Sequence, residues 1–173
     1  SLTAGTQIVA AVSDRQSRRS ETDATETSEE MFKPRLHRLQ WIYRDCPVYF
    51  VTACTAERRV LLADQRIYEA FRAFAQEAAG RHIWVGRYVL MPDHIHLFVA
   101  LARHSSTLSA WVKAMKGTIS KELRSRGLPG PFWQKGFFDH VMRSAESYGE
   151  KWTYVRENPV RAGLVKQSGE WPF

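Results

Sequence analysis

A histidine pair inside an apolar stretch is the feature that most constrains how this chain can fold. Residues 88–101 read Tyr-Val-Leu-Met-Pro-Asp-His-Ile-His-Leu-Phe-Val-Ala-Leu, and Pro92-Asp93 predicts a tight turn between two strands. Because side chains alternate between the two faces of a strand, His94 and His96 are expected on one face. The opposite face then carries the apolar side chains of Ile95, Leu97, Val99 and Leu101.

The same histidine pair indicates a metal site. Two neutral imidazoles side by side on a rigid strand provide half of the ligands for a divalent ion. The alternative is that both are polar residues on the wet face of a sheet. A hydrolase with a His-x-His-x-His strand is disfavoured, because the third position is Phe98.

The remaining hydrophobic pattern predicts an α+β domain. The expected elements are strands at residues 49–55, 82–91, 94–101 and 137–143, and helices at 64–80, 106–127 and 147–157. Asp64 and Ser106 are the expected helix starts, and Gly80 and Gly127 the expected stops. The order is that of a ferredoxin-like βαββαβ sandwich, with two helices on one face of an antiparallel sheet. The first two helices leave the histidine face open, and the additional last helix is free to cross or edge that face.

Composition and charge restrict which partners the domain is expected to bind. The sequence predicts a flexible tail at residues 1–30, which are rich in polar and charged side chains, and one domain over residues 31–173. The tail carries −3 of the total charge of +7, which leaves +10 on the other 143 residues. Such a balance is typical of a nucleic-acid partner, although many small proteins are basic without one.

The sequence disfavours both a membrane protein and a protein stabilised by disulfides. The chain contains no apolar run of transmembrane length and no signal-peptide pattern, so we expect a cytoplasmic protein without a membrane partner. Cys46 and Cys54 are too few for a disulfide scaffold.

A second group of candidate residues lies near the C-terminus. Tyr154 and Asn158 are four residues apart, so on one helix they would share a face. A phenol can act as a nucleophile, and an amide oxygen is an acceptable ligand for Mg²⁺ or Mn²⁺. Alternatively, Asn158-Pro159 begins a short helix that stops at Gly163, and Tyr154 is a packing residue.

Three motifs in order along the chain resemble those of the single-tyrosine HUH transposases, and most closely the REP-associated tyrosine transposase branch. The motifs are Leu90 to His96, Phe132 to Val141 and Tyr154 to Val165. The resemblance spans roughly residues 35–166, which is nearly the whole expected domain.

The resemblance implies a function and a set of site residues. His94 and His96 would bind Mg²⁺ or Mn²⁺, Tyr154 would be the nucleophile, and Asn158 would stand where relatives place a polar third ligand, in some cases glutamine. The enzyme would cleave and rejoin single-stranded DNA near a REP-type hairpin through a 5′-phosphotyrosine, as a monomer or a homodimer. The alternative is a non-catalytic nucleic-acid-binding module on the same fold.

DNA contacts are expected from basic and aromatic residues off the core-facing stripes. The candidates for phosphate contacts are Lys113, Lys116, Lys121, Arg143, Arg156 and Arg161. Trp133 and Phe137 are candidates for stacking on unpaired bases. His140 stands alone in the sequence and is expected to be structural.

Overall fold

The computed structural model describes residues 46–173. The predicted tail at residues 1–30 and the first part of the expected domain lie outside these residues, so both remain predictions.

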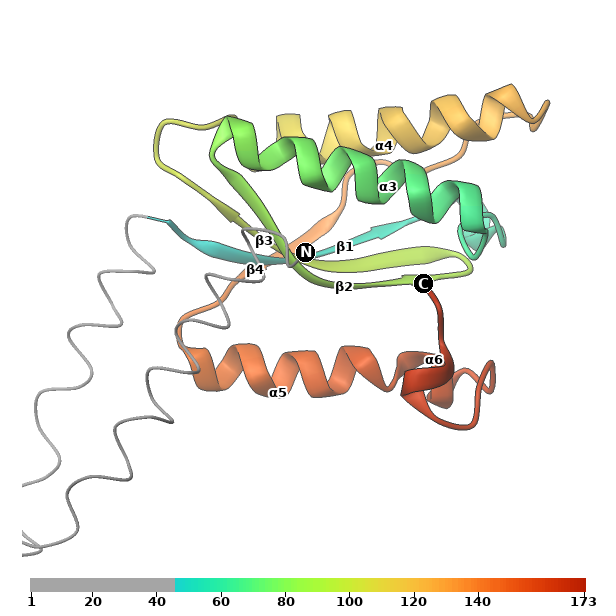
Figure 1. Cartoon of the computed structure of the whole chain (residues 1–173). Coiled ribbons are helices and arrows are strands. Elements are labelled where there is room, and N and C mark those ends of the chain that lie inside the picture. The colour runs from blue at the N-terminus through green and yellow to red at the C-terminus, as the bar shows by residue number, and fades with distance from the viewer. Residues whose placement is uncertain (1–45) are drawn as a thin grey trace, which may run out of the picture.

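A four-stranded antiparallel sheet forms the middle of the molecule (Figure 1). Its strands are β1 (Val48–Cys54), β2 (Ile83–Met91), β3 (His94–Leu101) and β4 (Phe138–Val141), in the spatial order β2-β3-β1-β4. Together with the helices between them, this arrangement confirms the expected ferredoxin-like fold. The central strands are β3 and β1.

Two helices cover one face of the sheet (Figure 1). They are α3 (Gln65–Ala78) and α4 (Leu108–Ser125). The Asp64 carboxylate accepts the first free N–H groups of α3, as predicted. The expected start of α4 at Ser106 was wrong by one position, because the Thr107 hydroxyl caps the helix by accepting the Ala110 N–H.

The helix ends follow backbone conformation. Gly127, with a φ of 76°, ends α4 as predicted. The expected stop at Gly80 was wrong, because a 3-10 turn (Ala79–Arg81) extends α3 and the left-handed residue is His82, with a φ of 58°. The strand expected from residue 82 therefore begins at Ile83.

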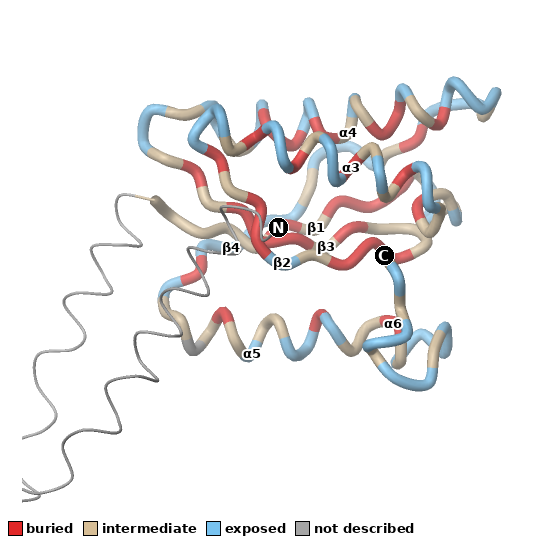
Figure 2. The backbone as a smooth tube through the Cα atoms, viewed as in Figure 1, coloured by how far each residue is buried: buried red, intermediate tan, exposed pale blue. Residues whose placement is uncertain are grey.

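The main core lies between this face of the sheet and the two helices. The side chains that alternate with the histidines on β3 are all in it, namely Ile95, Leu97, Val99 and Leu101. They pack with buried residues of both helices, such as Phe71 and Met115. Most residues of β2 and β3 and several of β1 are accordingly buried (Figure 2).

A third layer covers part of the opposite face (Figure 1). It consists of α5 (Ala145–Arg156), the short α6 (Asn158–Arg161) and a 3-10 turn (Ser168–Glu170). Val155 of α5 is fully buried against Val89 and Met91 of β2. Of the two positions left open for the last helix, it therefore takes the one that crosses the histidine face, where these apolar side chains hold α5 on the sheet.

Two predicted boundaries in this region also shifted. The fourth strand covers only Phe138–Val141, and all four of its residues are exposed. The last helix begins at Ala145, earlier than residue 147, because Ser144 and Ser147 form a reciprocal capping box.

We expect Val155→Ala to weaken the attachment of α5. The substitution removes two buried methyl groups and leaves a cavity, which should lower the free energy of unfolding by about 2 kcal/mol. Urea denaturation measures this change. Val60→Ala is the matched control, because Val60 is 77% exposed and its loss should change the free energy by less than about 0.5 kcal/mol.

Candidate active site

The two histidines of β3 meet on the sheet face that carries α5. Their Nε2 atoms are 3.1 Å apart, and the rings are nearly perpendicular. Phe50 of β1 stacks against His96, with 5.4 Å between the ring centroids. The β2–β3 turn places His94 first in the strand, so both imidazoles stand at one end of the sheet.

Each histidine uses its other ring nitrogen to contact a neighbouring side chain. His94 Nδ1 lies 2.6 Å from Asp93 Oδ1, and His96 Nδ1 lies 2.8 Å from the Thr52 hydroxyl. Arg58 holds the second oxygen of the Asp93 carboxylate at 2.7 Å. A carboxylate that accepts the Nδ1 proton leaves the Nε2 lone pair of His94 free.

Thr52 and Arg58 are site residues that were not predicted. Thr52 is brought to His96 by the register of β1 against β3, which pairs these two positions. Arg58 is placed by a turn in which Glu57 and Arg58 both have positive φ values, 53° and 56°. Neither residue belongs to a local motif. Both reach the histidines only through contacts between segments that are distant in the sequence, so the sequence carried no signal for them.

Burial keeps both imidazoles neutral. Burial is the main cause that lowers the pKa of His96 to about 3, and the nearby His94, Arg58, Arg161 and Lys151 lower it further. Burial also lowers the pKa of His94, although the Asp93 carboxylate partly opposes this effect. Neutral imidazoles are the form that binds metal ions.

Tyr154 and Asn158 are brought together by Arg161. Tyr154 is 59% exposed on α5, and the Arg161 guanidinium lies 3.9 Å from the centre of its ring. The same guanidinium donates hydrogen bonds to the Tyr154 carbonyl, at 2.7 Å, and to Asn158 Oδ1. A short helix does begin at Asn158-Pro159, with Gly163 at a φ of 68° after it, but its N-cap is Glu157 and not Asn158.

The histidine geometry fits a divalent ion. Two nitrogen ligands at right angles, each about 2.1 Å from an ion, lie about 3.0 Å apart, close to the observed Nε2 separation of 3.1 Å. Within residues 46–173 no third His, Cys, Asp or Glu joins them in a metal-binding group. The Asn158 oxygen accepts a hydrogen bond from Arg161, while its buried Nδ2 has no hydrogen-bond partner among the described residues.

The predicted DNA contacts fall in different places. Lys113, Lys116 and Lys121 lie on α4, across the sheet from the histidines (Figure 1). Arg143 is exposed between β4 and α5, and Arg156 pairs with Glu157 at 3.3 Å. A DNA contact by any of these residues remains a prediction.

Lys116 and Trp133 form a structural contact. The Lys116 ammonium donates to the carbonyls of Gln134, at 3.2 Å, and Gly136, and lies 5.4 Å from the centre of the Trp133 ring. The indole N–H of Trp133 donates to the Lys116 carbonyl and to Ser120 Oγ. Phe137 packs against the main core. Base stacking by Trp133 or Phe137 stays a prediction.

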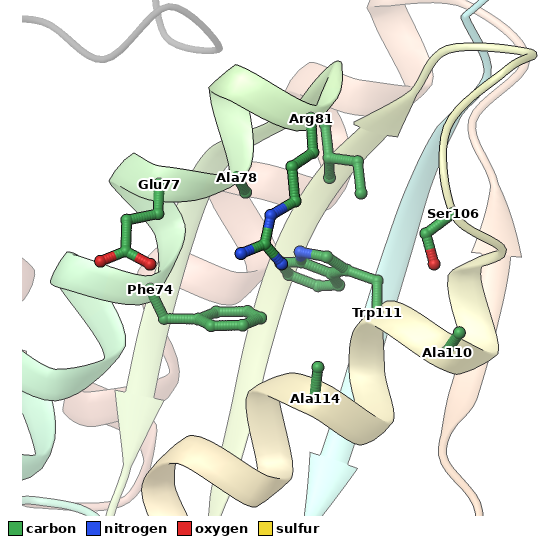
Figure 3. Close-up of a pocket in the computed structure, with 9 residues that line it drawn as sticks. Phe74, Glu77, Ala78, Arg81, Ser106, Ala110, Trp111 and Ala114 are labelled. Atoms are coloured by element: carbon green, nitrogen blue, oxygen red, sulfur yellow. The ribbon is translucent and has the colours of Figure 1, made fainter.

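A hollow of about 70 Å³ lies elsewhere, between α3 and α4 (Figure 3). Phe74 and Trp111 form its apolar walls, and Arg81 also lines it. None of the candidate site residues lines this hollow.

The family model described as "Transposase IS200 like" matches residues 44–158. The chain belongs to this transposase family. The matched segment contains both histidines, Tyr154 and Asn158. None of the described helices of this transposase is long and apolar enough to cross a membrane.

Relatives and solved structures agree with the family. The REP-associated tyrosine transposase of Escherichia coli K12 is 25% identical over 125 residues, which cover 72% of this chain and 73% of that protein. A protein of Haemophilus influenzae is 23% identical over 136 residues, covering 73% of this chain and 77% of its own. A solved REP-associated tyrosine transposase bound to a REP hairpin has the same fold, with a TM-score of 0.61 and 24% identity over 87% of this chain and 81% of that one.

We expect the buried imidazoles to make the transposase sensitive to acid. The pKa of His96 is lowered from 6.5 to about 3, so the unfolded chain takes up a proton that the folded chain excludes. The free energy of unfolding is therefore highest above pH 6.5 and decreases as the pH falls toward 3. Between pH 6.5 and about pH 5 we expect it to decrease by about 2 kcal/mol. Urea denaturation at several pH values measures this loss.

The matched variants are His96→Gln and His104→Gln. His96→Gln should flatten the pH dependence, while the same change at the exposed His104 should leave it as in the wild type. An unchanged slope in His96→Gln would show that another group governs the loss of stability.

Proposed function

We propose that this transposase cleaves and rejoins single-stranded DNA beside a hairpin, with Tyr154 as the nucleophile. The observation that carries the proposal is the position of the phenol. Tyr154 is exposed and is held from its ring and its carbonyl by Arg161, whose charge also acts on His96. A phenol that is solvent-accessible and conformationally restrained suits nucleophilic attack, and Arg161 links it to the histidine pair.

The reaction begins with attack of the Tyr154 oxygen on the phosphorus of the scissile phosphodiester. The phenol loses its proton, the new bond joins the tyrosine oxygen to phosphorus, and the bond from phosphorus to the 3′ oxygen breaks. That 3′ oxygen leaves and takes up a proton, which yields a 5′-phosphotyrosine and a free 3′-hydroxyl. Attack by another 3′-hydroxyl reverses these steps and rejoins DNA without ATP.

His94 and His96 would hold Mg²⁺ or Mn²⁺ through their Nε2 atoms, as the spacing of these atoms supports. When bound, such an ion polarises the scissile phosphate and offsets negative charge on its oxygens. Asp93 and Thr52 orient the two rings from behind. Asn158 would be the third ligand. Its amide oxygen would then give up the hydrogen bond from Arg161 and bind the ion.

The DNA substrate is inferred from charge and from relatives. The 143 residues after the acidic N-terminal segment carry +10, which favours a polyphosphate partner. The solved relative binds a REP hairpin, and a hairpin with a single-stranded flank is the substrate that we extend to this chain.

We expect Tyr154→Phe to abolish cleavage and the covalent adduct, while DNA affinity stays within a few-fold of the wild type. The substitution removes only the nucleophilic oxygen and keeps the ring under Arg161. The measurement uses a labelled hairpin oligonucleotide with Mn²⁺, with adducts resolved on a denaturing gel and affinity by anisotropy.

The control for this experiment is Tyr148→Phe, because Tyr148 is only 5% exposed and packs against Phe98. This control should still form the adduct. Cleavage by Tyr154→Phe would place the nucleophile elsewhere. Binding without cleavage by the wild type would instead support a non-catalytic binding module.

We expect Thr52→Val to weaken Mn²⁺ binding by about 10-fold to 100-fold. Valine keeps the shape of threonine but cannot hydrogen-bond the Nδ1 of His96, so the ring loses its fixed orientation. Thr52→Ser, which keeps the hydroxyl, should restore most of the affinity. Titration calorimetry with MnCl₂ measures it, and equal affinity in all three proteins would remove Thr52 from the site.

A further inference from the structure

We propose that the uncovered part of the histidine face, next to β4, binds an unpaired nucleobase of the DNA flank, with Phe138 as the stacking platform. This inference rests on the proposed function, because it names where the strand lies on either side of the scissile phosphate. Stacking on an aromatic ring is the main sequence-tolerant way in which proteins hold single strands.

Strand register places Phe138 in the same row as the candidate active site. Phe138 of β4 pairs with Thr52 of β1, and Thr52 pairs with His96 of β3. Residues that pair directly across strands point to the same face of a sheet. Adjacent strands lie about 4.8 Å apart, so the backbone of Phe138 is about 10 Å from that of His96.

Phe138 is unusual in its exposure. It is 72% exposed, and among the Phe, Tyr and Trp side chains of residues 46–173 only Tyr154 is also in the exposed class. All four residues of β4 are exposed, whereas Phe50 of β1 and Phe98 of β3 pack in a cluster with Tyr148 and Trp152 of α5. A solvent-exposed phenylalanine in the same row as the candidate active site is available to stack on an unpaired base.

The flank of α5 that faces this surface carries the nucleophile. The Lys151 ammonium lies 5.4 Å from the centre of the Phe50 ring, on β1, and Arg87 of β2 lies against Trp152 on the other flank. Lys151 therefore marks the side of α5 that faces β1 and, beyond it, β4. Tyr154 follows Lys151 by three residues and shares that side of the helix.

Charge on this surface matches a nucleic-acid strand. Lys151 and Arg161 supply positive charge along α5 and α6, and both act on His96. The one carboxylate of β4, Asp139, pairs with Val51 and so points toward the main core side of the sheet. The backbones of Phe138 and His96 are about 10 Å apart, so a strand whose scissile phosphate lies at the histidines can place a base on Phe138 about three nucleotides away, at about 3.4 Å per stacked nucleotide.

The test uses the full chain and a DNA hairpin with an oligothymidine flank, with 2-aminopurine placed at successive flank positions. We expect quenching of its fluorescence at one position or two adjacent positions in the wild type. Phe138→Leu should lose this quenching and bind the hairpin about 10-fold more weakly, while Phe138→Trp should retain both. An abasic flank at the same position should weaken the wild type but not Phe138→Leu.

The matched control is Val141→Ala. Val141 is exposed on the same strand but pairs with Tyr49, so it points to the opposite face. This variant should quench and bind like the wild type. Because Phe138 and Val141 are both exposed, thermal unfolding should be unchanged in either variant.

Other outcomes separate the site from the proposed reaction. If the wild type cleaves DNA but Phe138→Leu binds and quenches normally, the stacking role of Phe138 is overturned, while the proposed cleavage reaction is supported. If Phe138→Leu loses binding and quenching but the wild type forms no covalent adduct, the stacking role of Phe138 is supported and the proposed cleavage reaction is overturned. If Phe138→Leu changes only the oligomeric state, measured by light scattering, β4 serves a second copy of the chain and the base site is overturned.

Discussion

The register of β3 between β1 and β2 is the constraint on which the candidate site depends. The apolar side chains Ile95 and Leu97 are completely buried under α3 and α4, so β3 has one stable alignment with its neighbours. A slip by one residue would move both histidines into the main core and these apolar side chains onto the α5 face. The same register pairs Thr52 with His96, and the pairing of β1 with β4 places Phe138 beside Thr52. Core packing, rather than polar contacts, therefore assembles the site.

Local patterns predicted much of this arrangement. The alternation along residues 88–101 was sufficient to place His94 and His96 together, and Asp64 and Gly127 marked helix ends through their own chemistry. The roles of Thr52 and Arg58 could not be predicted, because both depend on strand pairing and a strained turn far from the histidine motif. Whether the last helix would cross the histidine face or only edge it also stayed open, since the pattern of residues 145–156 does not say which part of the sheet it will meet.

The positive charge of the chain divides between the two outer layers. Basic residues of α4 lie across the sheet from the histidines, whereas Arg58, Lys151 and Arg161 stand close enough to lower the pKa of His96. These three are held by specific partners, namely a carboxylate, an aromatic ring, and a tyrosine with an asparagine. Fixed cations of this kind can position a phosphate, while the exposed lysines of α4 contribute mainly a long-range field.

The double burial of β3 also limits how this chain can evolve. Residue Phe98 is buried against α5 while its neighbours Leu97 and Val99 are buried against the helices on the other face, so neither side of the strand faces open solvent there. A single-residue insertion or deletion after the Pro92-Asp93 turn would exchange the two sets of side chains and lose both cores at once. Length changes should instead accumulate in the exposed loop before β4, around residues 126–131, where the backbone can lengthen without altering any strand pairing.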